Sequence, residues 1–249
     1  MLMVSPHRPV TYALGDFKNN IFHPIKWYNF DHSPVFYAPN SLVDHKRRNI
    51  VIGWIRMEGN EGWNGCFSLP RVVELRDNIE TISALPIPEI AQLRKSHVET
   101  RNISIDKFDH RDILKCEEIL PLKDYVENKS LEVLIEVPGS AESGKLPSFH
   151  CNLYSDEKLI LEGALGYDAE DSRFYVGKNS GIFKLREGEE QLAIRIFIDR
   201  SVIEIFLNDR WAITQSLNIT ATSELTLDFH AEEQNLKIES IHAWGMGAI

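Results

Sequence analysis

Apolar and polar residues alternate with a period of two over several stretches of this chain, as expected for strands that bury one face. Residues 131–137 (LEVLIEV) alternate until Pro138-Gly139 interrupts the run. Residues 192–217 contain three such runs, which are separated at Asp199-Arg200 and at Asn208-Asp209-Arg210. Because short polar turns between alternating runs are typical of hairpins, we predict a three-stranded meander here.

Two further stretches complete the predicted strand pattern. Ile50-Val51-Ile52 is a short apolar run that follows the basic, turn-like residues 45–49. Residues 225–230 and 236–244 also alternate, and the polar residues 232–235 between them predict another hairpin. The chain is therefore expected to be all-β.

A single stretch has the features of a helix. Pro86-Ile87-Pro88 precedes EIAQLRK, which has an acidic residue in its first turn and apolar residues three positions apart. We predict a linker with a short helix over residues 81–98. It would separate a first segment rich in Gly, Trp and Pro, residues 1–80, from residues 99–249. The strand number and turn spacing of that second part suit a β-sandwich.

The composition is that of an ordinary globular protein. Of the 249 residues, 43% are hydrophobic and 26% are charged, and the formal net charge is −10. The acidic residues are spread along the chain, which argues against nucleic acid and membrane surfaces as partners, because both attract clustered Lys and Arg. Neutral substrates such as sugars remain open.

The first residues lack the basic start and apolar stretch of a signal peptide, so we expect a cytoplasmic protein if Met1 is its natural start.

The chain has three widely spaced cysteines, Cys66, Cys116 and Cys151. They form no Cys-x-x-Cys motif and have no histidine cluster nearby, so no metal site is indicated. We expect three free thiols in a reducing compartment, and one disulfide among them is the open alternative.

An ordered set of motifs begins in residues 35–75 and continues into the second half of the chain. The motifs are, in order, Tyr37-Ala38, Asp44, Arg47-Arg48, Gly53-Trp54, Gly62-Trp63-Asn64-Gly65, Leu69-Pro70-Arg71, LPIPEIAQLR at 85–94 and DRSVIEIF at 199–206. In these motifs the chain resembles glycoside hydrolase family 32, the β-fructofuranosidases, which include invertases, inulinases and levanases. Residues 1–17 also fit, so the resemblance covers essentially the whole chain. One departure is Pro34-Val35, where many members of the family have Asp before Phe-Tyr-Ala.

The resemblance implies a five-bladed β-propeller followed by a β-sandwich, and this chain would hold the last part of the propeller together with the sandwich. It also implies a retaining hydrolase of sucrose or fructans that needs no cofactor. The family's catalytic residues lie in Asn-Asp-Pro-Asn, Arg-Asp-Pro and Glu-Cys motifs, none of which occurs here. We expect these motifs upstream of Met1, so we predict that this chain has no catalytic residue and is inactive alone. Its partner would be a missing N-terminal propeller half or a second copy.

Tyr37 and Trp54 are the candidate substrate-binding residues. The resemblance places the matching aromatic residues in the wall of a fructose pocket. A furanose presents a C–H-rich face and hydroxyl groups, which suit an aromatic plane and a phenol. The alternative is that both residues are core aromatics of the propeller. For Trp63 and Arg71 we favour a structural role at a closing corner, where Arg71 could pair with a carboxylate.

Carboxylates of the first segment are expected to be solvated or to cap turns rather than to form a catalytic pair. They are Asp16, Asp31, Asp44, Glu58 and Glu61.

A second hypothesis is a non-catalytic carbohydrate-binding or assembly module built around the sandwich. Aromatic residues on a sandwich face would support it, and equally they suit a core. The candidates are Tyr154, Tyr167, Phe174 and Tyr175.

Overall fold

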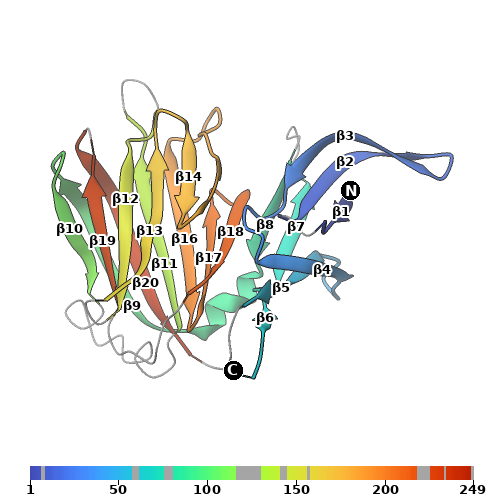
Figure 1. Ribbon diagram of the computed structural model, residues 1–249, viewed down its shortest axis with the longest axis horizontal. Coiled ribbons are helices and arrows are strands. Elements are labelled where there is room, and N and C mark those ends of the chain that lie inside the picture. The colour runs from blue at the N-terminus through green and yellow to red at the C-terminus, as the bar shows by residue number, and fades with distance from the viewer. Residues whose placement is uncertain are drawn as a thin grey trace. The chain divides into compact units, whose positions relative to one another are not determined.

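The computed structural model describes most of the chain, and its regular structure is almost entirely β (Figure 1). The described residues are 1–6, 9–57, 62–75, 81–115, 130–140, 145–155, 158–217, 225–232 and 234–247. The chain forms two compact units, which are Met1–Ile90 with Asp209–Ser216, and Ala91–Asn208 with Leu217–Ile249. No helix within the described ranges is long and apolar enough to cross a membrane.

The first unit contains two antiparallel sheets. The strands of the three-stranded sheet lie in the order β1 (Leu2–Val4), β2 (Thr11–Lys18) and β3 (Ile21–Asn29). Asn19 and Asn20 join β2 to β3 with φ angles of 51° and 61°, which is the backbone that a two-residue hairpin turn requires.

The second sheet of this unit has the order β4-β5-β7-β8, and β6 pairs with β5 outside that path. Its strands are β4 (Phe36–Val43), β5 (Asn49–Arg56), β6 (Gly65–Phe67), β7 (Arg71–Leu75) and β8 (Ile82–Pro86). The strand predicted around Ile50-Val51-Ile52 is therefore confirmed as β5.

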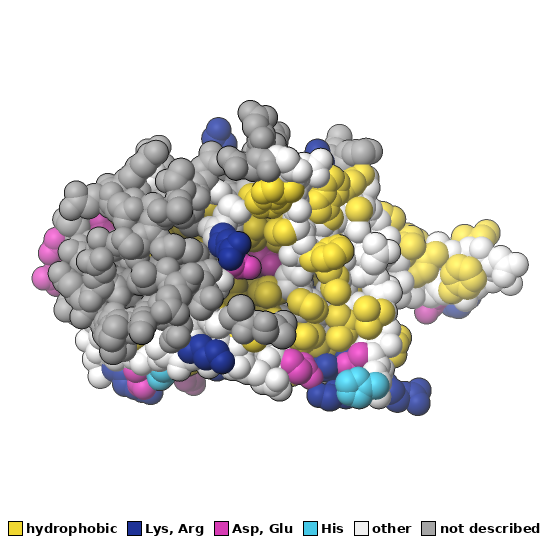
Figure 2. Space-filling view, turned by 90° about the horizontal axis from the view of Figure 1, so that it is seen from below, with side chains coloured by type: hydrophobic (Ala, Val, Ile, Leu, Met, Phe, Trp, Pro, Cys, Tyr) yellow, Lys and Arg dark blue, Asp and Glu magenta, His cyan; other side chains and the backbone are white. Residues whose placement is uncertain are grey.

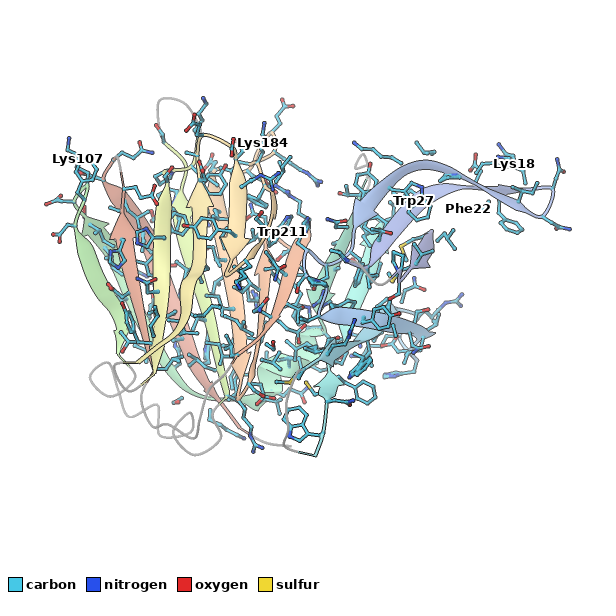
Figure 3. All side chains as sticks on the ribbon, in the orientation of Figure 1. Lys18, Phe22, Trp27, Lys107, Lys184 and Trp211 are labelled. Atoms are coloured by element: carbon cyan, nitrogen blue, oxygen red, sulfur yellow. The ribbon has the colours of Figure 1, made fainter. Side chains whose placement is uncertain are left out.

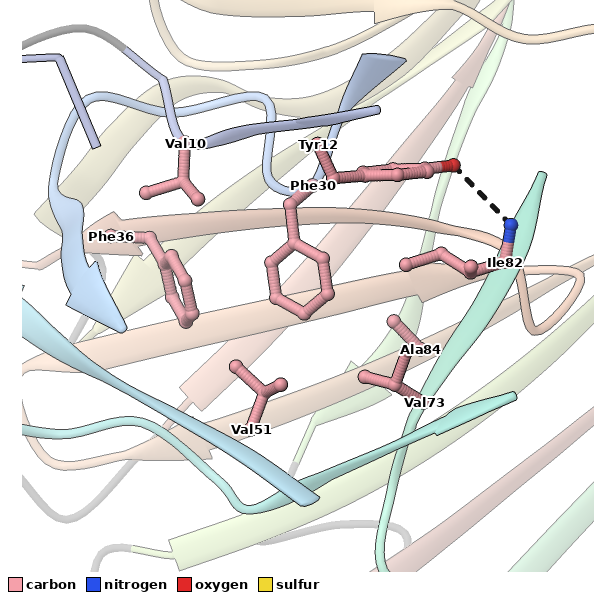
Figure 4. Close-up of a cluster of buried hydrophobic side chains, with 8 residues drawn as sticks. All are labelled: Val10, Tyr12, Phe30, Phe36, Val51, Val73, Ile82 and Ala84. Carbon is pink, nitrogen blue, oxygen red and sulfur yellow. Dashed lines mark hydrogen bonds between the residues drawn. The ribbon is translucent and has the colours of Figure 1, made fainter. Parts of the chain in front are cut away.

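A cluster of buried side chains from both sheets forms the core of the first unit (Figure 4). The Ile82 backbone N–H donates a 3.3 Å hydrogen bond to the Tyr12 hydroxyl at one end of this cluster. In the middle of β5, Gly53 leaves room for the Phe36 ring, because a Cβ at this position would collide with it. The members of the cluster are Val10, Tyr12, Phe30, Phe36, Val51, Val73, Ile82 and Ala84.

A 3₁₀ helix, η1 (Pro88–Leu93), follows β8 and precedes β9 along the chain. It is the one helix among the residues described. The strands after it are β9 (Arg94–Ile105), β10 (His110–Lys115), β11 (Ser130–Pro138), β12 (Phe149–Ser155), β13 (Lys158–Asp168), β14 (Arg173–Val176), β15 (Asn179–Ile182), β16 (Gln191–Asp199), β17 (Val202–Leu207), β18 (Trp211–Ser216), β19 (Leu225–Ala231) and β20 (Leu236–Met246).

These strands form two six-stranded sheets. One has the order β10-β19-β12-β13-β14-β15, and the other has the order β18-β17-β16-β11-β20-β9. Alternate side chains of the strands are buried, including Phe149, Cys151 and Leu153 of β12 and Leu131, Val133, Ile135 and Val137 of β11. The strand predicted at 131–137 and the meander predicted at 192–217 are confirmed as β11 and as β16, β17 and β18.

The hairpin predicted from residues 225–244 is wrong. Both strands exist, but β19 lies between β10 and β12 in one sheet, whereas β20 lies between β11 and β9 in the other. The polar connection crosses from sheet to sheet, and the Asn235 side chain accepts a 3.0 Å hydrogen bond from the Lys107 backbone N–H. Alternation identifies a strand with one buried face, but it does not identify the neighbour that pairs with it.

Candidate functional site

Three aromatic residues form a row across neighbouring strands of the first unit. Tyr37 of β4 is the cross-strand partner of Trp54 of β5, and Trp54 is in turn the partner of Phe67 of β6. Directly paired residues of antiparallel strands project to the same face of the sheet. The structure thus brings the two predicted site residues together, with ring centroids 6.4 Å apart and planes inclined at 62°.

This row lies on the face opposite the core of the unit. The chain neighbours of the row, Phe36 and Ile55, are fully buried, whereas Tyr37 and Trp54 are half-buried and Phe67 is 83% exposed. Successive residues of a strand point to opposite faces, so the alternation explains the difference. The aromatic row therefore offers ring surface and the Tyr37 hydroxyl outside the hydrophobic core.

A cation extends the row. Arg56 follows Trp54 by two residues and so shares its face, and the Arg56 guanidinium lies 5.3 Å from the centroid of the Tyr37 ring. A cation–π contact of this kind contributes about 0.5–1 kcal/mol at an exposed site. Arg56 adds hydrogen-bond donors beside the aromatic surface.

The backbone around the row is strained in β4. The register shifts between Tyr37 and Asn40, and Ala38 within this bulge has a φ of 43°, a value that residues with a Cβ seldom adopt. The Ala38 N–H donates a 3.1 Å hydrogen bond to the Ser5 hydroxyl. Such outliers persist where the surrounding structure holds them, and they occur often at binding sites.

Gly65 explains part of the glycine-rich motif at 62–65. Its φ is 153°, and a Cβ at this position would collide with the indole Nε1 of Trp54 and the carbonyl oxygen of Ile55. The absence of a side chain at residue 65 therefore allows the Trp54 indole to lie against β6. The requirement was not visible from the sequence, because it depends on the pairing of β5 with β6.

A fully buried ion pair lies elsewhere in this unit. Asp31 and Arg71 are both inaccessible, and the Arg71 Nη1 lies 3.0 Å from the Asp31 Oδ2. The Thr214 hydroxyl donates to Asp31 Oδ2 (2.7 Å) and accepts from Arg71 Nη2 (2.8 Å). The Thr214 and Ser33 backbone N–H groups donate to Asp31 Oδ1 at 3.0 and 3.1 Å.

The prediction that Arg71 pairs with a carboxylate is confirmed, and the expectation that Asp31 is solvated or merely caps a turn is wrong. Both Asp31 oxygens accept bonds inside the unit, and the Arg71 guanidinium also lies 4.5 Å from the centroid of the Phe36 ring. An inaccessible carboxylate in this position holds segments together rather than attacking a substrate.

The other carboxylates behave as expected where they are described. Asp16 pairs with Lys18 at the surface. Asp44 caps a turn by accepting the backbone N–H groups of Lys46 and Arg48 at 3.0 and 2.8 Å, and it also pairs with the Arg48 side chain. Glu58 and Glu61 lie outside the described residues.

Arg48 also binds Glu89, the residue that follows Pro88 in the predicted linker. Two Arg48 nitrogens lie 3.0 Å from the two Glu89 oxygens, and Lys46 Nζ lies 2.6 Å from one of them. Hydrogen bonds from the Arg48 and Lys46 side chains lower the pKa of Glu89 to about 2.

His32, to which the sequence assigns no role, is packed into the first unit. Its ring stacks on Trp211 with centroids 4.2 Å apart, and its Nδ1 lies 3.0 Å from the Ala212 carbonyl oxygen, to which it donates when it carries the proton. Burial lowers the pKa of His32, so the ring is neutral at pH 7.

The sandwich aromatics do not form a common platform. Tyr167 and Phe174 are buried, with 4% and 0% of their surface exposed, whereas Tyr154 and Tyr175 are half-buried. Burial, followed by the negative charges of Glu232 and Asp168, raises the pKa of Tyr175 to about 12. Two of the four residues proposed for a carbohydrate-binding face therefore belong to the core.

Cys66 and Cys151 form no disulfide in the described part of the chain, in agreement with the expected thiols, and Cys116 lies outside that part. Cys151 is completely buried, and its burial raises the pKa of the thiol well above its ordinary value.

Two family models match the chain in succession. The model of the glycosyl hydrolases family 32 N-terminal domain matches residues 1–86, and the model of the family 32 C-terminal region matches residues 89–245. A sucrose-6-phosphate hydrolase of Escherichia coli is 29% identical over 231 residues, which are 87% of this chain and 43% of that protein. A levanase of Bacillus subtilis is 26% identical, with 96% of this chain and 37% of that protein covered. The chain thus spans less than half the length of these curated relatives.

Solved structures show the same fold. Fructan 1-exohydrolase IIa from Cichorium intybus, in complex with 1-kestose, superposes with a TM-score of 0.75 at 17% identity, over 96% of this chain and 55% of that one. Exo-inulinase from Aspergillus awamori superposes with a TM-score of 0.73 at 14% identity, over 99% of this chain and 53% of that one. The predicted fold class, the terminal part of a β-propeller followed by a β-sandwich, is confirmed.

Proposed function

Because the chain belongs to glycoside hydrolase family 32, we propose that it is the C-terminal part of a retaining β-fructosidase acting on sucrose or fructans, and that it needs no cofactor. Retaining glycosidases place two carboxyl groups about 5–5.5 Å apart, one as nucleophile and one as acid/base. The three motifs that carry these groups in the family do not occur among the 249 residues. We therefore propose that this chain supplies part of the substrate-binding wall and is inactive without the remaining propeller.

The aromatic row of Tyr37, Trp54 and Phe67 is the observation that carries this proposal. A fructosyl ring would lie with its C–H-rich face on the Trp54 indole, while the Tyr37 phenol exchanges a hydrogen bond with a sugar hydroxyl. Three features favour a binding role for the row over a core role. The row projects away from the core, β4 bulges at Ala38 beside it, and Gly65 leaves room for the Trp54 indole against β6.

Exposed apolar side chains support association of the first unit with further propeller segments. Apolar side chains gather on the face of this unit that Figure 2 shows, and Phe22 and Trp27 lie along β3 in Figure 3. Strand β3 is almost entirely exposed, and 82% of Ile25 and 70% of Phe17 on the paired strand are accessible. Exposed edges and apolar strands of this kind favour pairing with another segment, and self-association is the alternative outcome.

The test is fructose release from sucrose and inulin by the purified chain, at high concentration and with long incubation, followed by addition of the N-terminal half of a family 32 enzyme in trans. We expect no release by the chain alone and release by the mixture. Release by the chain alone that copurifies with it through several steps would contradict the proposal, because carboxylates outside the three motifs would then be catalytic.

A matched pair of variants tests the binding wall. Trp54→Ala should remove most of the activity of the reconstituted mixture, chiefly through KM. Trp63→Ala is the control, because Trp63 belongs to the same motif region but not to the aromatic row, and 48% of it is exposed. Equal losses in the two variants, with folding intact, would exclude Trp54 as a specific wall residue.

A further inference from the structure

Two histidines and a glutamate converge on one face of the second unit, away from every motif discussed above. They lie on the adjacent antiparallel strands β9 and β20, where His242 is the cross-strand partner of Glu99 and Trp244 is the partner of His97. Cross-strand partners and alternate residues of a strand share a face, so all four side chains project to the same side of the sheet. Strand β9 is at the edge of its sheet.

The ligand atoms of this group are close together. His97 Nε2 lies 3.2 Å from His242 Nδ1, and the same His242 nitrogen lies 3.9 Å from Glu99 Oε2. All three ligand atoms lie within 4.8 Å of one another. Around a tetrahedral zinc ion with bonds of about 2.0–2.1 Å, neighbouring ligand atoms are about 3.3 Å apart. The two imidazole nitrogens already have this separation, and the carboxylate oxygen lies about 0.6 Å too far from His242 Nδ1 by the same geometry.

From this geometry we infer a binding site for a divalent transition-metal ion, formed by His97, His242 and Glu99. Two imidazoles and one carboxylate suit Zn²⁺, Ni²⁺ or Cu²⁺ and do not suit Ca²⁺ or Mg²⁺, which prefer oxygen ligands. Three protein ligands leave at least one position of the metal for water or an incoming group.

Packing around the histidines limits their motion while leaving the site accessible. The His97 ring lies parallel to Trp244, with centroids 4.9 Å apart, and the Arg94 guanidinium covers Trp244 at 3.9 Å. Arg94 is in turn held by two hydrogen bonds to the buried Glu132, at 2.7 and 2.6 Å. These contacts form a supporting layer next to the metal ligands.

Two adjustments accompany metal binding. The His97 and His242 centroids are 5.4 Å apart although their nitrogens are 3.2 Å apart, so the rings meet through their nitrogen-bearing edges in parallel planes. One ring must therefore turn about its Cβ–Cγ bond, a torsion with a broad minimum, and the exposure of His97 allows this turn. The metal also takes the place of the hydrogen bond between the two nitrogens.

Arg101 competes with the metal for Glu99. Its Nε pairs with Glu99 Oε1, whereas the other oxygen, Oε2, faces His242. A carboxylate that binds the metal through one oxygen can keep this ion pair, but the positive charge of Arg101 weakens metal binding. Removal of Arg101 should therefore strengthen binding at this site, whereas zinc bound by histidines elsewhere on the surface would not be affected.

The experiment is calorimetric titration of the 249-residue chain with ZnCl₂, together with the visible absorption of bound Co²⁺. The variant His97→Ala/His242→Ala is compared with the matched control His150→Ala/His230→Ala. The control removes a second stacked histidine pair, with centroids 4.4 Å apart, whose nitrogens bond instead to Glu232 and Asp228.

We expect the wild-type protein and the control variant to bind one more equivalent of Zn²⁺ than the His97→Ala/His242→Ala variant does. Both should also show the visible spectrum of Co²⁺ with a low coordination number, and the His97→Ala/His242→Ala variant should lack it. Arg101→Gln should bind more tightly, and Glu99→Gln roughly tenfold or more weakly. Ca²⁺ should not compete. The inference is overturned if removing His97 and His242 leaves the zinc stoichiometry unchanged while the variant keeps the wild-type thermal unfolding curve, or if Arg101→Gln has no effect on affinity.

Discussion

Replacing Asp31 with alanine removes the carboxylate that lies 3.0 Å from the guanidinium of the fully buried Arg71. It also removes the acceptor of the Thr214 hydroxyl and of the Thr214 and Ser33 backbone N–H groups. The guanidinium cannot lose its proton, so the variant must bury an uncompensated charge or open the unit to water.

The expected loss follows from these contacts. Breaking a buried ion pair by removing one partner costs about 3–5 kcal/mol, and most of this is the penalty of the charge left behind. Each buried donor that loses its acceptor costs about 1–3 kcal/mol, although water admitted by the smaller side chain offsets part of that loss. We therefore expect the first unit to lose about 3–5 kcal/mol, a large share of the total stability of about 5–15 kcal/mol that is usual for a domain.

The assay is urea unfolding followed by tryptophan fluorescence in a Trp244→Phe background. Trp244 belongs to the second unit, whereas Trp27, Trp54, Trp63 and Trp211 belong to the first. The remaining fluorescence then comes from tryptophans of the first unit, which reduces the contribution of a separate transition of the sandwich.

The double variant Asp31→Leu/Arg71→Met decides whether the buried charge is the cause. Removing both charges with apolar residues of similar size should cost less than the sum of the single variants, by about 2 kcal/mol or more. A loss below about 1 kcal/mol in Asp31→Ala, or strict additivity in the double variant, would refute the reasoning.

Three further predictions concern single residues. Gly65→Ala should displace the Trp54 indole, which a quenched or shifted emission of Trp54 and weaker fructan binding would show. Gly62→Ala is the control, because Gly62 also has a positive φ, of 83°, but a Cβ there would meet no other atom within 4 Å. Burial lowers the pKa of His32, so below pH about 6.5 the unfolded chain binds a proton that the folded unit does not. Stability of the first unit should therefore fall from pH 7 to pH 5 more steeply in wild-type protein than in His32→Phe, and equal slopes would contradict this. The buried Cys151 should react with iodoacetamide only on unfolding, as peptide mass mapping would show.

The local strand pattern was predictable because strand periodicity depends on neighbouring residues. The alternation at 131–137 and the two turns in 192–217 correspond to β11 and to β16, β17 and β18. Arg200, Asn208 and Asp209 have positive φ in these turns, as tight turns between strands require.

Strand partners were not predictable in the same way. The residues of β19 and β20 alternate as those of a hairpin would, yet each strand pairs within a different sheet. The choice of neighbour is made by the packing of whole sheets, and four connecting residues can either turn back or cross between sheets.

The sequence by itself determined the all-β character, the order of the family motifs and the two aromatic residues of the candidate wall. Each of these depends on residue identity or on spacing within a few positions. The tertiary structure decided that Tyr37 and Trp54 are cross-strand partners, that Asp31 meets Arg71 and Thr214, and that His97, Glu99 and His242 converge. Asp31 and Thr214 are 183 residues apart in the chain. Contacts over such separations follow from the pairing and burial of strands, and no local pattern records them.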